Sequence, residues 1–145
     1  MRILFDPDTL HQSKRGSSVT GAVYFDFDPD RQFPSVGWND FVVVLANWWM
    51  LALDKLVEGQ PEVDFLFMDG PYRITAISQG AGLLLRCTGD RRDARLPYEV
   101  AIQTDDLKRE LLTFARSVLA ACKEAQIESI DLDGLRTYLS RYLPN

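Results

Sequence analysis

The stretch FVVVLANWWMLAL, residues 41–53, limits the fold of this chain more than any other feature of its sequence. It is too short to cross a bilayer, which takes about 20 apolar residues. An apolar pattern of this length, with Gly59 beyond its end, predicts a helix from about Asp40 to Val57, capped by Asn39 or its neighbour and with Asp40 in its first turn. Its narrow polar side holds only Asp40, Asn47, Asp54 and Glu58. Most of this helix must therefore be covered by the rest of the domain or by another chain.

Two adjacent tryptophans lie in the middle of this helix. Neighbouring helical positions differ by about 100°, so Trp48 and Trp49 cannot point at the same place. A ligand cage of Trp48 and Trp49 with Trp38 and Phe41 is one interpretation, but tryptophans on an apolar helix are most often core residues. The exception would be the one tryptophan that the domain cannot cover.

Strand-like segments flank the helix on both sides. RILF (2–5) and TGAVYFDFD (20–28) precede it, and the polar stretch 7–18 is predicted to be a loop between them. Four segments follow it, separated by turn signals, and predict an antiparallel meander: EVDFLFMD, YRITAIS, AGLLLRCTG and ARLPYEVAIQ. The connections are too short for crossover helices. Pro97 lacks a backbone donor and indicates an edge strand.

Two amphipathic helices are expected at the C-terminal end. Thr104 is predicted to cap the first, with Asp105 and Asp106 in its first turn, and Asp131 to begin the second. The fold class is therefore α+β, with one domain over 1–145. It is expected to have a mostly antiparallel sheet of five to six strands, one very apolar helix after the second strand, and the two C-terminal helices.

Charge and cysteine content limit the partners and the compartment. The net charge is −5, and residues 1–72 carry 5 Lys and Arg against 11 Asp and Glu, giving −6. Such a surface repels nucleic acid and attracts a basic protein. Cys87 and Cys122 form neither a CxxC pair nor a disulfide framework, and the N-terminus lacks a secretory signal. We expect a cytoplasmic protein with no membrane or nucleic-acid partner.

The aspartates of VYFDFDPD are the strongest candidates for catalysis or metal binding. Asp26, Asp28 and Asp30 have the spacing that opens an EF-hand loop, but the sixth and twelfth positions hold Arg31 and Gly37 instead of Gly and Glu. The spacing also resembles phosphatases of the haloacid dehalogenase type, with Asp26 as nucleophile and Asp28 as acid. That family has a parallel sheet, unlike the meander expected here. The favoured interpretation is a solvated strand face.

No other catalytic pattern is present. His11 is the only histidine and falls in the polar stretch, with no link to Cys87, Cys122 or a serine. GAGLLL at 80–85 lacks the lysine of a phosphate-binding loop. We therefore expect a protein that is not an enzyme, with no catalytic residue, no cofactor and no metal.

Two motifs resemble those of a known group of proteins. FPSVGWNDFVVVLANWW (33–49) followed by FLFMDGPY (65–72) resembles small bacterial proteins that look like immunity proteins of polymorphic toxin or contact-dependent inhibition systems. The resemblance covers Phe33 to Tyr72, well under half of the chain. It implies a non-enzymatic protein that binds and neutralises a cognate toxin domain.

On this resemblance, acidic side chains are the expected contacts to a basic toxin such as a nuclease, and two aromatic residues are candidate anchors. These partner-binding candidates are Asp26, Asp28, Asp30, Asp64, Asp69, Tyr72 and Trp38. For Asp69 and Trp38, a turn and a helix-packing role are the structural alternatives. A further functional alternative is an acidic secretion chaperone that forms a homodimer through the helix at 40–57.

Overall fold

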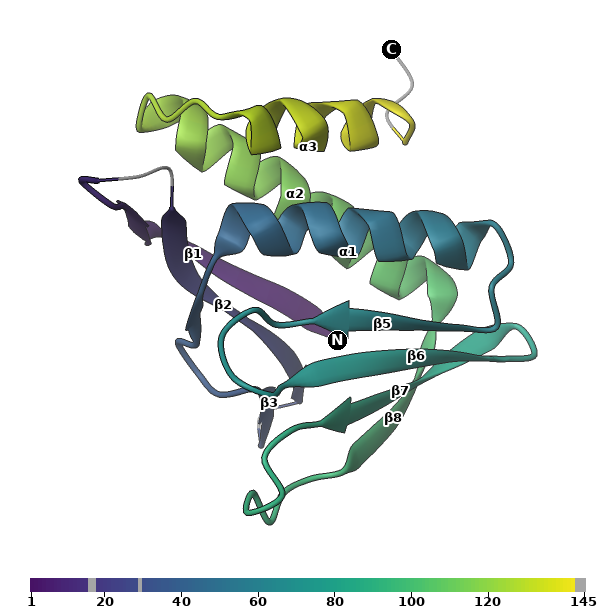
Figure 1. The fold of residues 1–145 in the computed structure, drawn as a ribbon. Helices are drawn as coiled ribbons and strands as arrows, with labels where there is room; N and C mark the ends of the chain where they lie inside the picture. The colour runs from purple at the N-terminus through teal and green to yellow at the C-terminus, as the bar shows by residue number, and fades with distance from the viewer. Residues whose placement is uncertain (16–17, 29, 143–145) are drawn as a thin grey trace.

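The computed structural model describes residues 1–15, 18–28 and 30–142. Within these residues the chain forms two four-stranded antiparallel sheets and three helices, so the α+β class is confirmed (Figure 1). The expectation of one sheet with five to six strands is wrong. Helix α1 (Val42–Val57) contacts β2 of the first sheet and β5 of the second.

The first sheet contains β1 (Arg2–Gln12), β2 (Val19–Asp28), β3 (Arg31–Phe33) and β4 (Asn39–Asp40), with β2 pairing with each of the others. The predicted loop over 7–18 is therefore wrong for residues 7–12, which continue β1. The register shifts between Asp6 and His11, and inside the shift the Thr9 hydroxyl accepts a hydrogen bond from the Ala22 amide. A long partner strand thus orders a polar segment that has no strand pattern of its own.

The second sheet contains β5 (Glu62–Leu66), β6 (Arg73–Gln79), β7 (Gly82–Thr88) and β8 (Tyr98–Gln103). Their order in the sheet is their order in the chain, and every pair is antiparallel, which confirms the meander. β8 is an edge strand, as Pro97 indicated. β5 is the other edge and lies beside α1 (Figure 1).

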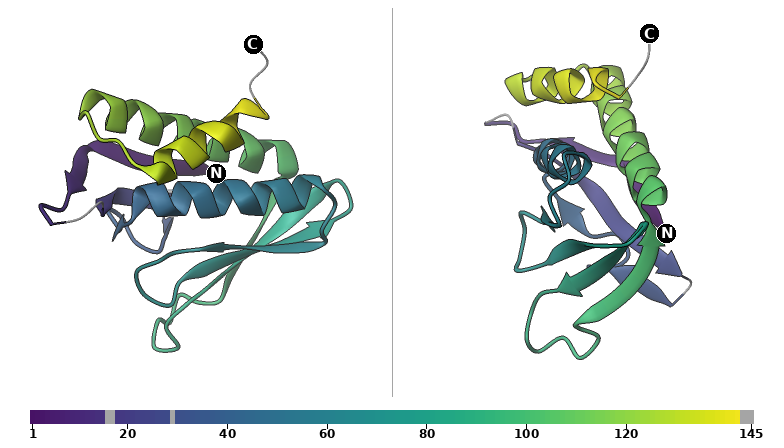
Figure 2. Two further views of the ribbon diagram at one scale, coloured as in Figure 1. Left: turned by 45° about the horizontal axis from the view of Figure 1, so that its top comes forward. Right: turned by 90° about the vertical axis from the view of Figure 1, so that its right-hand side faces the viewer.

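α1 lies in the middle of the molecule, in contact with β2, β5 and both other helices (Figure 2). It begins two residues later than expected because Asp40 pairs with Gly21 in the first sheet. Asn39 does not cap it; the residue before the helix is Phe41, and no side chain caps it there. The expected polar side is also partly wrong. Asp40 and Asp54 are buried, because Asp40 binds neighbouring loops and Asp54 binds Arg141 and Tyr142.

α2 (Thr104–Glu124) and α3 (Ile130–Ser140) complete the fold. Asp105 and Asp106 are in the first turn of α2 as expected, but Thr104 is its first residue and the cap position is Gln103. α3 begins one residue before Asp131, and the Ser129 side chain caps it by accepting from the Leu132 amide. α2 packs on α1 and β1, and α3 packs on α1 and α2.

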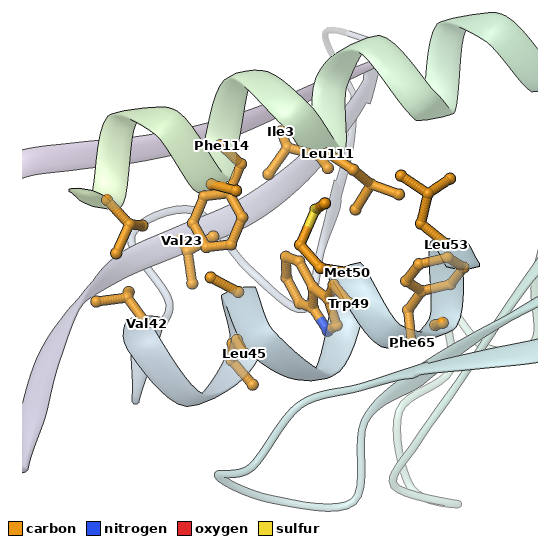
Figure 3. Close-up of a cluster of buried hydrophobic side chains, with 14 of the residues drawn as sticks. Ile3, Val23, Val42, Leu45, Trp49, Met50, Leu53, Phe65, Leu111 and Phe114 are labelled. Atoms are coloured by element: carbon orange, nitrogen blue, oxygen red, sulfur yellow. The ribbon is translucent and has the colours of Figure 1, made fainter. Parts of the chain in front are cut away.

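The hydrophobic core lies between the two sheets and the helices (Figure 3). Trp49 is at its centre, where its ring contacts those of Phe25, Phe67 and Phe114. The indole nitrogen of Trp49 donates to the Leu66 carbonyl at 2.8 Å. Strand alternation works as expected: Phe25 in β2 and Val63 and Phe65 in β5 are buried, with acidic neighbours on the opposite faces.

Candidate functional site

Exposed apolar side chains gather where α1 meets β5. Seven large apolar side chains are exposed among the described residues, and four of them border this junction: Trp48, Leu51, Leu66 and Met68, at 40, 42, 42 and 48% exposure. The other three, Val36, Val57 and Ile130, line neither of the two hollows at the junction. Scattered apolar residues on a surface are ordinary, but neighbouring ones that border a depression indicate a contact surface.

A groove separates the helix from the strand at this junction. Its volume is about 400 Å³. One wall is formed by Trp48, Leu51 and Lys55 of α1, and the other by Glu62, Asp64 and Leu66 of β5, with the buried Ala52 and Val63 between them. We call this the α1–β5 groove. Ala52 is small, and its short side chain leaves the floor of the groove open.

A second hollow continues the α1–β5 groove. It measures about 390 Å³, shares Trp48 and Leu66 with the groove, and extends past Met68 to Tyr72 and Gly89. The structure also has a larger hollow of about 550 Å³ between β8 and the first sheet. Its apolar lining includes Phe27, Val100 and Ile102, which are only half-exposed, and none of the seven exposed large apolar side chains. The α1–β5 groove is therefore the better candidate for binding.

Helical geometry explains why one tryptophan reaches this surface. Trp48, Leu51, Ala52 and Lys55 are three or four residues apart and form one stripe of α1. Trp49 is rotated by about 100° from Trp48 and faces the core instead. The expectation that the two side chains point in different directions is confirmed. The expectation that tryptophans of an apolar helix are core residues holds for Trp49, and Trp48 is the exception.

Two of the predicted anchors, Trp38 and Tyr72, take part in the domain's own packing. The Trp38 indole donates to Asp40 at 3.0 Å, and its ring contacts the Tyr72 ring edge to face at 5.2 Å. Tyr72 also contacts Phe33, and it packs so closely on Gly89 that a β-carbon there would lie 2.3 Å from its ring. Both aromatic residues are half-buried. The structure thus gives each a packing role, while one side of Tyr72 borders the second hollow.

Asp40, which sequence reasoning did not choose, organises this region. One carboxylate oxygen accepts from the Phe41 amide at 2.7 Å, and the other accepts from Trp38 and from the Asp69 amide at 3.1 Å. The carboxylate thus joins the start of α1 to the loop between β5 and β6. Asp69 and Gly70 form a turn in that loop, where Gly70 has a φ of +80°. No signal in the sequence distinguishes Asp40 from an ordinary aspartate of a first helical turn.

The aspartates of β2 lie on the first sheet, away from the α1–β5 groove. Asp26 is half-buried and accepts from the Gln32 side chain at 3.0 Å. Asp28 is exposed and accepts from the Asp30 amide at 2.9 Å, forming the turn into β3. Burial raises the pKa of Tyr98, and the negative charge of Asp28 adds to that increase. The structure does not bring this set together with Asp64.

Asp64 is the only one of the seven predicted residues that lines the α1–β5 groove. Its carboxylate accepts from the Thr75 hydroxyl at 2.6 Å and lies 3.9 Å from the Arg73 guanidinium. Sequence reasoning missed Trp48, Leu51, Leu66 and Met68 as individual surface residues. The available signal was that α1 has more apolar residues than one core can cover.

Three features bear on the catalytic and metal-binding interpretations of the sequence. The largest pKa increases belong to Cys87 and Tyr142, and the main cause in both is burial. In the described part of the chain, no group of three or more His, Cys, Asp or Glu side chains is placed to hold a metal ion. The antiparallel sheets also differ from the parallel sheet that the phosphatase interpretation of Asp26 and Asp28 requires.

Two further findings concern the chain as a whole. None of the helices in residues 1–15, 18–28 and 30–142 combines the length and apolarity needed to span a membrane. Comparisons of the chain with protein-family models, with curated proteins and with solved structures find no match.

Proposed function

We propose that this chain is a binding protein of the immunity type, which occupies and neutralises a toxin domain. The observation that carries the proposal is the apolar, hollowed surface around Trp48, where Leu51, Leu66 and Met68 stand exposed. Exposed aromatic and aliphatic side chains beside a depression are typical of surfaces that bury against another protein. The resemblance of residues 33–49 and 65–72 to immunity proteins supplies the biological class.

The charge of the chain supports a basic partner. Residues 1–72 carry an excess of six acidic residues, and the groove is lined by two acidic side chains, Glu62 and Asp64, and one basic side chain, Lys55. Complementary charge accelerates the encounter of two proteins and discriminates against wrong partners. A toxin that acts on nucleic acid carries a basic surface, so it fits this charge. On this proposal the protein acts in the cytoplasm, without a cofactor.

The chaperone alternative requires a homodimer through the apolar helix. Most of α1 is covered by the chain's own sheets and helices, so the surface left for a second copy is the side with Trp48 and Leu51. Sedimentation of the purified chain distinguishes the two proposals. A monomer that binds a toxin domain in a one-to-one complex supports immunity, and a stable dimer without toxin binding supports the chaperone.

Co-expression tests the proposal directly. The C-terminal domain of the protein encoded by the adjacent reading frame is expressed in bacteria with and without this chain. We expect growth arrest by that domain alone and restored growth in the presence of the chain.

Trp48→Ala should weaken binding of the domain by about 2 kcal/mol, as truncation of an interface anchor does. Ile130→Ala, which removes an even more exposed apolar side chain at the start of α3, outside both hollows, serves as the control. Arrest that the chain does not relieve would contradict the proposal.

A further inference from the structure

Strand β5 has one side with no strand partner in the part of the chain that the structure describes. It is an edge strand, and among the described strands it pairs only with β6. The Phe67 amide donates to the Tyr72 carbonyl, and the Ser78 amide donates to the Pro61 carbonyl. Hydrogen-bonded pairs alternate along an antiparallel ladder, so Val63 and Phe65 also bond to β6. The amides and carbonyls of Glu62, Asp64 and Leu66 must therefore point the other way.

That free side is the side on which the α1–β5 groove lies. Glu62, Asp64 and Leu66 line the groove, and the Leu66 carbonyl is occupied by the Trp49 indole from α1. The remaining edge groups, from Glu62 to the Leu66 amide, belong to the strand that forms the wall of the groove across from Trp48 and Leu51. Unpaired edge groups next to an apolar wall provide the two components of strand addition: main-chain hydrogen bonds for affinity and side-chain pockets for specificity.

We infer that the α1–β5 groove takes an extended segment of a partner protein as an added strand on β5, with basic and apolar residues alternating along that segment. The inference rests on the proposed function, because it assumes a protein partner. Side chains opposite Glu62 and Asp64 lie on the face directed away from the helices, where Glu62, and Asp64 in competition with its own neighbour Arg73, favour Lys or Arg. The side chains between them face Trp48 and Leu51, which select apolar residues.

A second copy of this chain is a poorer occupant than a basic segment. In the fully overlapping antiparallel register, β5 against β5 of another copy places Asp64 opposite Asp64. Like charges directly opposite each other destabilise a strand pair. Each copy would also bring Glu62 to the same edge, and Lys55 is the one basic side chain that lines the groove. The charge of the strand therefore favours a different chain.

A peptide library tests the inference without knowledge of the partner. Random nine-residue peptides displayed on phage are selected on the wild-type chain, and binders that also bind Trp48→Ala are removed. We expect enriched peptides that alternate apolar residues with Lys or Arg. An enriched peptide should slow hydrogen exchange of the Glu62, Asp64 and Leu66 amides by about tenfold or more, because they gain hydrogen-bond partners. The Val63 and Phe65 amides, already bonded to β6, act as internal controls.

Asp64→Pro and Asp64→Ala form a matched pair. Both remove the carboxylate, but only proline removes the amide that faces the groove, and that amide is not part of the β5–β6 ladder. We expect Asp64→Pro to weaken the selected peptide by about tenfold more than Asp64→Ala, which corresponds to one lost hydrogen bond. If Asp64→Pro does not fold, methylation of alternate backbone nitrogens of the peptide tests the same bonds from the other side.

Several results would overturn the inference. The selection could yield no peptides whose binding requires Trp48, or peptides in which basic and apolar residues do not alternate. A bound peptide could protect amides outside β5 from exchange. The chain could also form a dimer whose β5 amides are already protected without peptide. The experiments also distinguish a failure of the strand inference from a failure of the proposed function. If the toxin domain is neutralised equally well by Asp64→Pro and no peptides are enriched, the strand inference alone fails. If peptides are enriched as expected but the toxin domain is not neutralised, the immunity proposal alone fails.

Discussion

Trp48 and Trp49 are consecutive residues of α1 and have opposite environments. Trp49 is 1% exposed, contacts three aromatic rings and donates a hydrogen bond to Leu66. Trp48 is 40% exposed and borders both the α1–β5 groove and the hollow beyond it. The residue type and the helix are the same. The comparison teaches that an apolar run can serve two purposes at once: one side holds the domain together and the other remains available to a partner.

The largest expected effect is on the free energy of unfolding, and it differs between the two tryptophans. Trp49→Ala should lower the free energy of unfolding by about 3–5 kcal/mol, because it leaves a cavity among packed aromatic rings. Trp48→Ala should lower it by less than about 1 kcal/mol, because its side chain is already partly in solvent. Urea unfolding followed by circular dichroism measures both values. Equal losses for the two variants would remove the distinction between the two sides of α1.

Substitution of Asp40 should have the next largest effect on stability, because its carboxylate connects the interior to the wall of the second hollow. Asp40→Ala removes the acceptor for the Trp38 indole and for the Phe41 and Asp69 amides, which should cost about 2–3 kcal/mol in unfolding free energy. Asp69→Ala keeps the Asp69 amide and removes only an exposed carboxylate, so it is the control. A loss below about 1 kcal/mol for Asp40→Ala would show that the loop between β5 and β6 is held by other contacts.

Alkaline pH probes the interior through a buried thiol. Burial raises the pKa of the Cys87 thiol from its ordinary 9.0 to about 12. The unfolded chain therefore loses this proton near pH 9 while the folded chain keeps it. Stability is fully present below pH 9 and decreases between pH 9 and 12, by at most about 1.4 kcal/mol per pH unit for one proton. Cys87→Ala should flatten the decrease measured by urea unfolding at pH 8, 9.5 and 10.5. An unchanged slope would contradict a buried thiol.

The smallest expected effect is on binding kinetics, and it distinguishes the acidic side chains of β2 from those of β5. Asp28→Lys should slow association with the toxin domain a few-fold at low salt and leave the dissociation rate unchanged, because Asp28 is exposed and outside the groove. Asp64→Lys, at the groove, should also accelerate dissociation. Stopped-flow or surface-resonance kinetics at two salt concentrations distinguish the two variants. If Asp28→Lys accelerated dissociation and Asp64→Lys did not, the interface would lie at β2 and not at the groove.

Local patterns predicted most of the elements but not how the sheets are divided. The strands of β5 to β8 and the helix ending before Gly59 follow from turn residues and periodicity, which act over a few neighbouring residues. The extension of β1 to Gln12 and the division into two sheets do not follow from such patterns. They depend on pairing with β2 and on the position of α1 between the sheets, which are contacts between distant segments.

The sequence by itself determined that α1 is a helix with more apolar surface than a single face requires, and that the first half of the chain is acidic. Those properties depend on residue type and spacing alone. Only the tertiary structure decided that Trp48 is the uncovered tryptophan, that Asp40 and Asp54 are buried, and that Asp64 lies on a free strand edge beside Trp48. The physical reason is that exposure is a property of what packs against a side chain. For α1 the packing partners are β2, β5, α2 and α3, which precede and follow it in the chain and are in part distant from it in sequence.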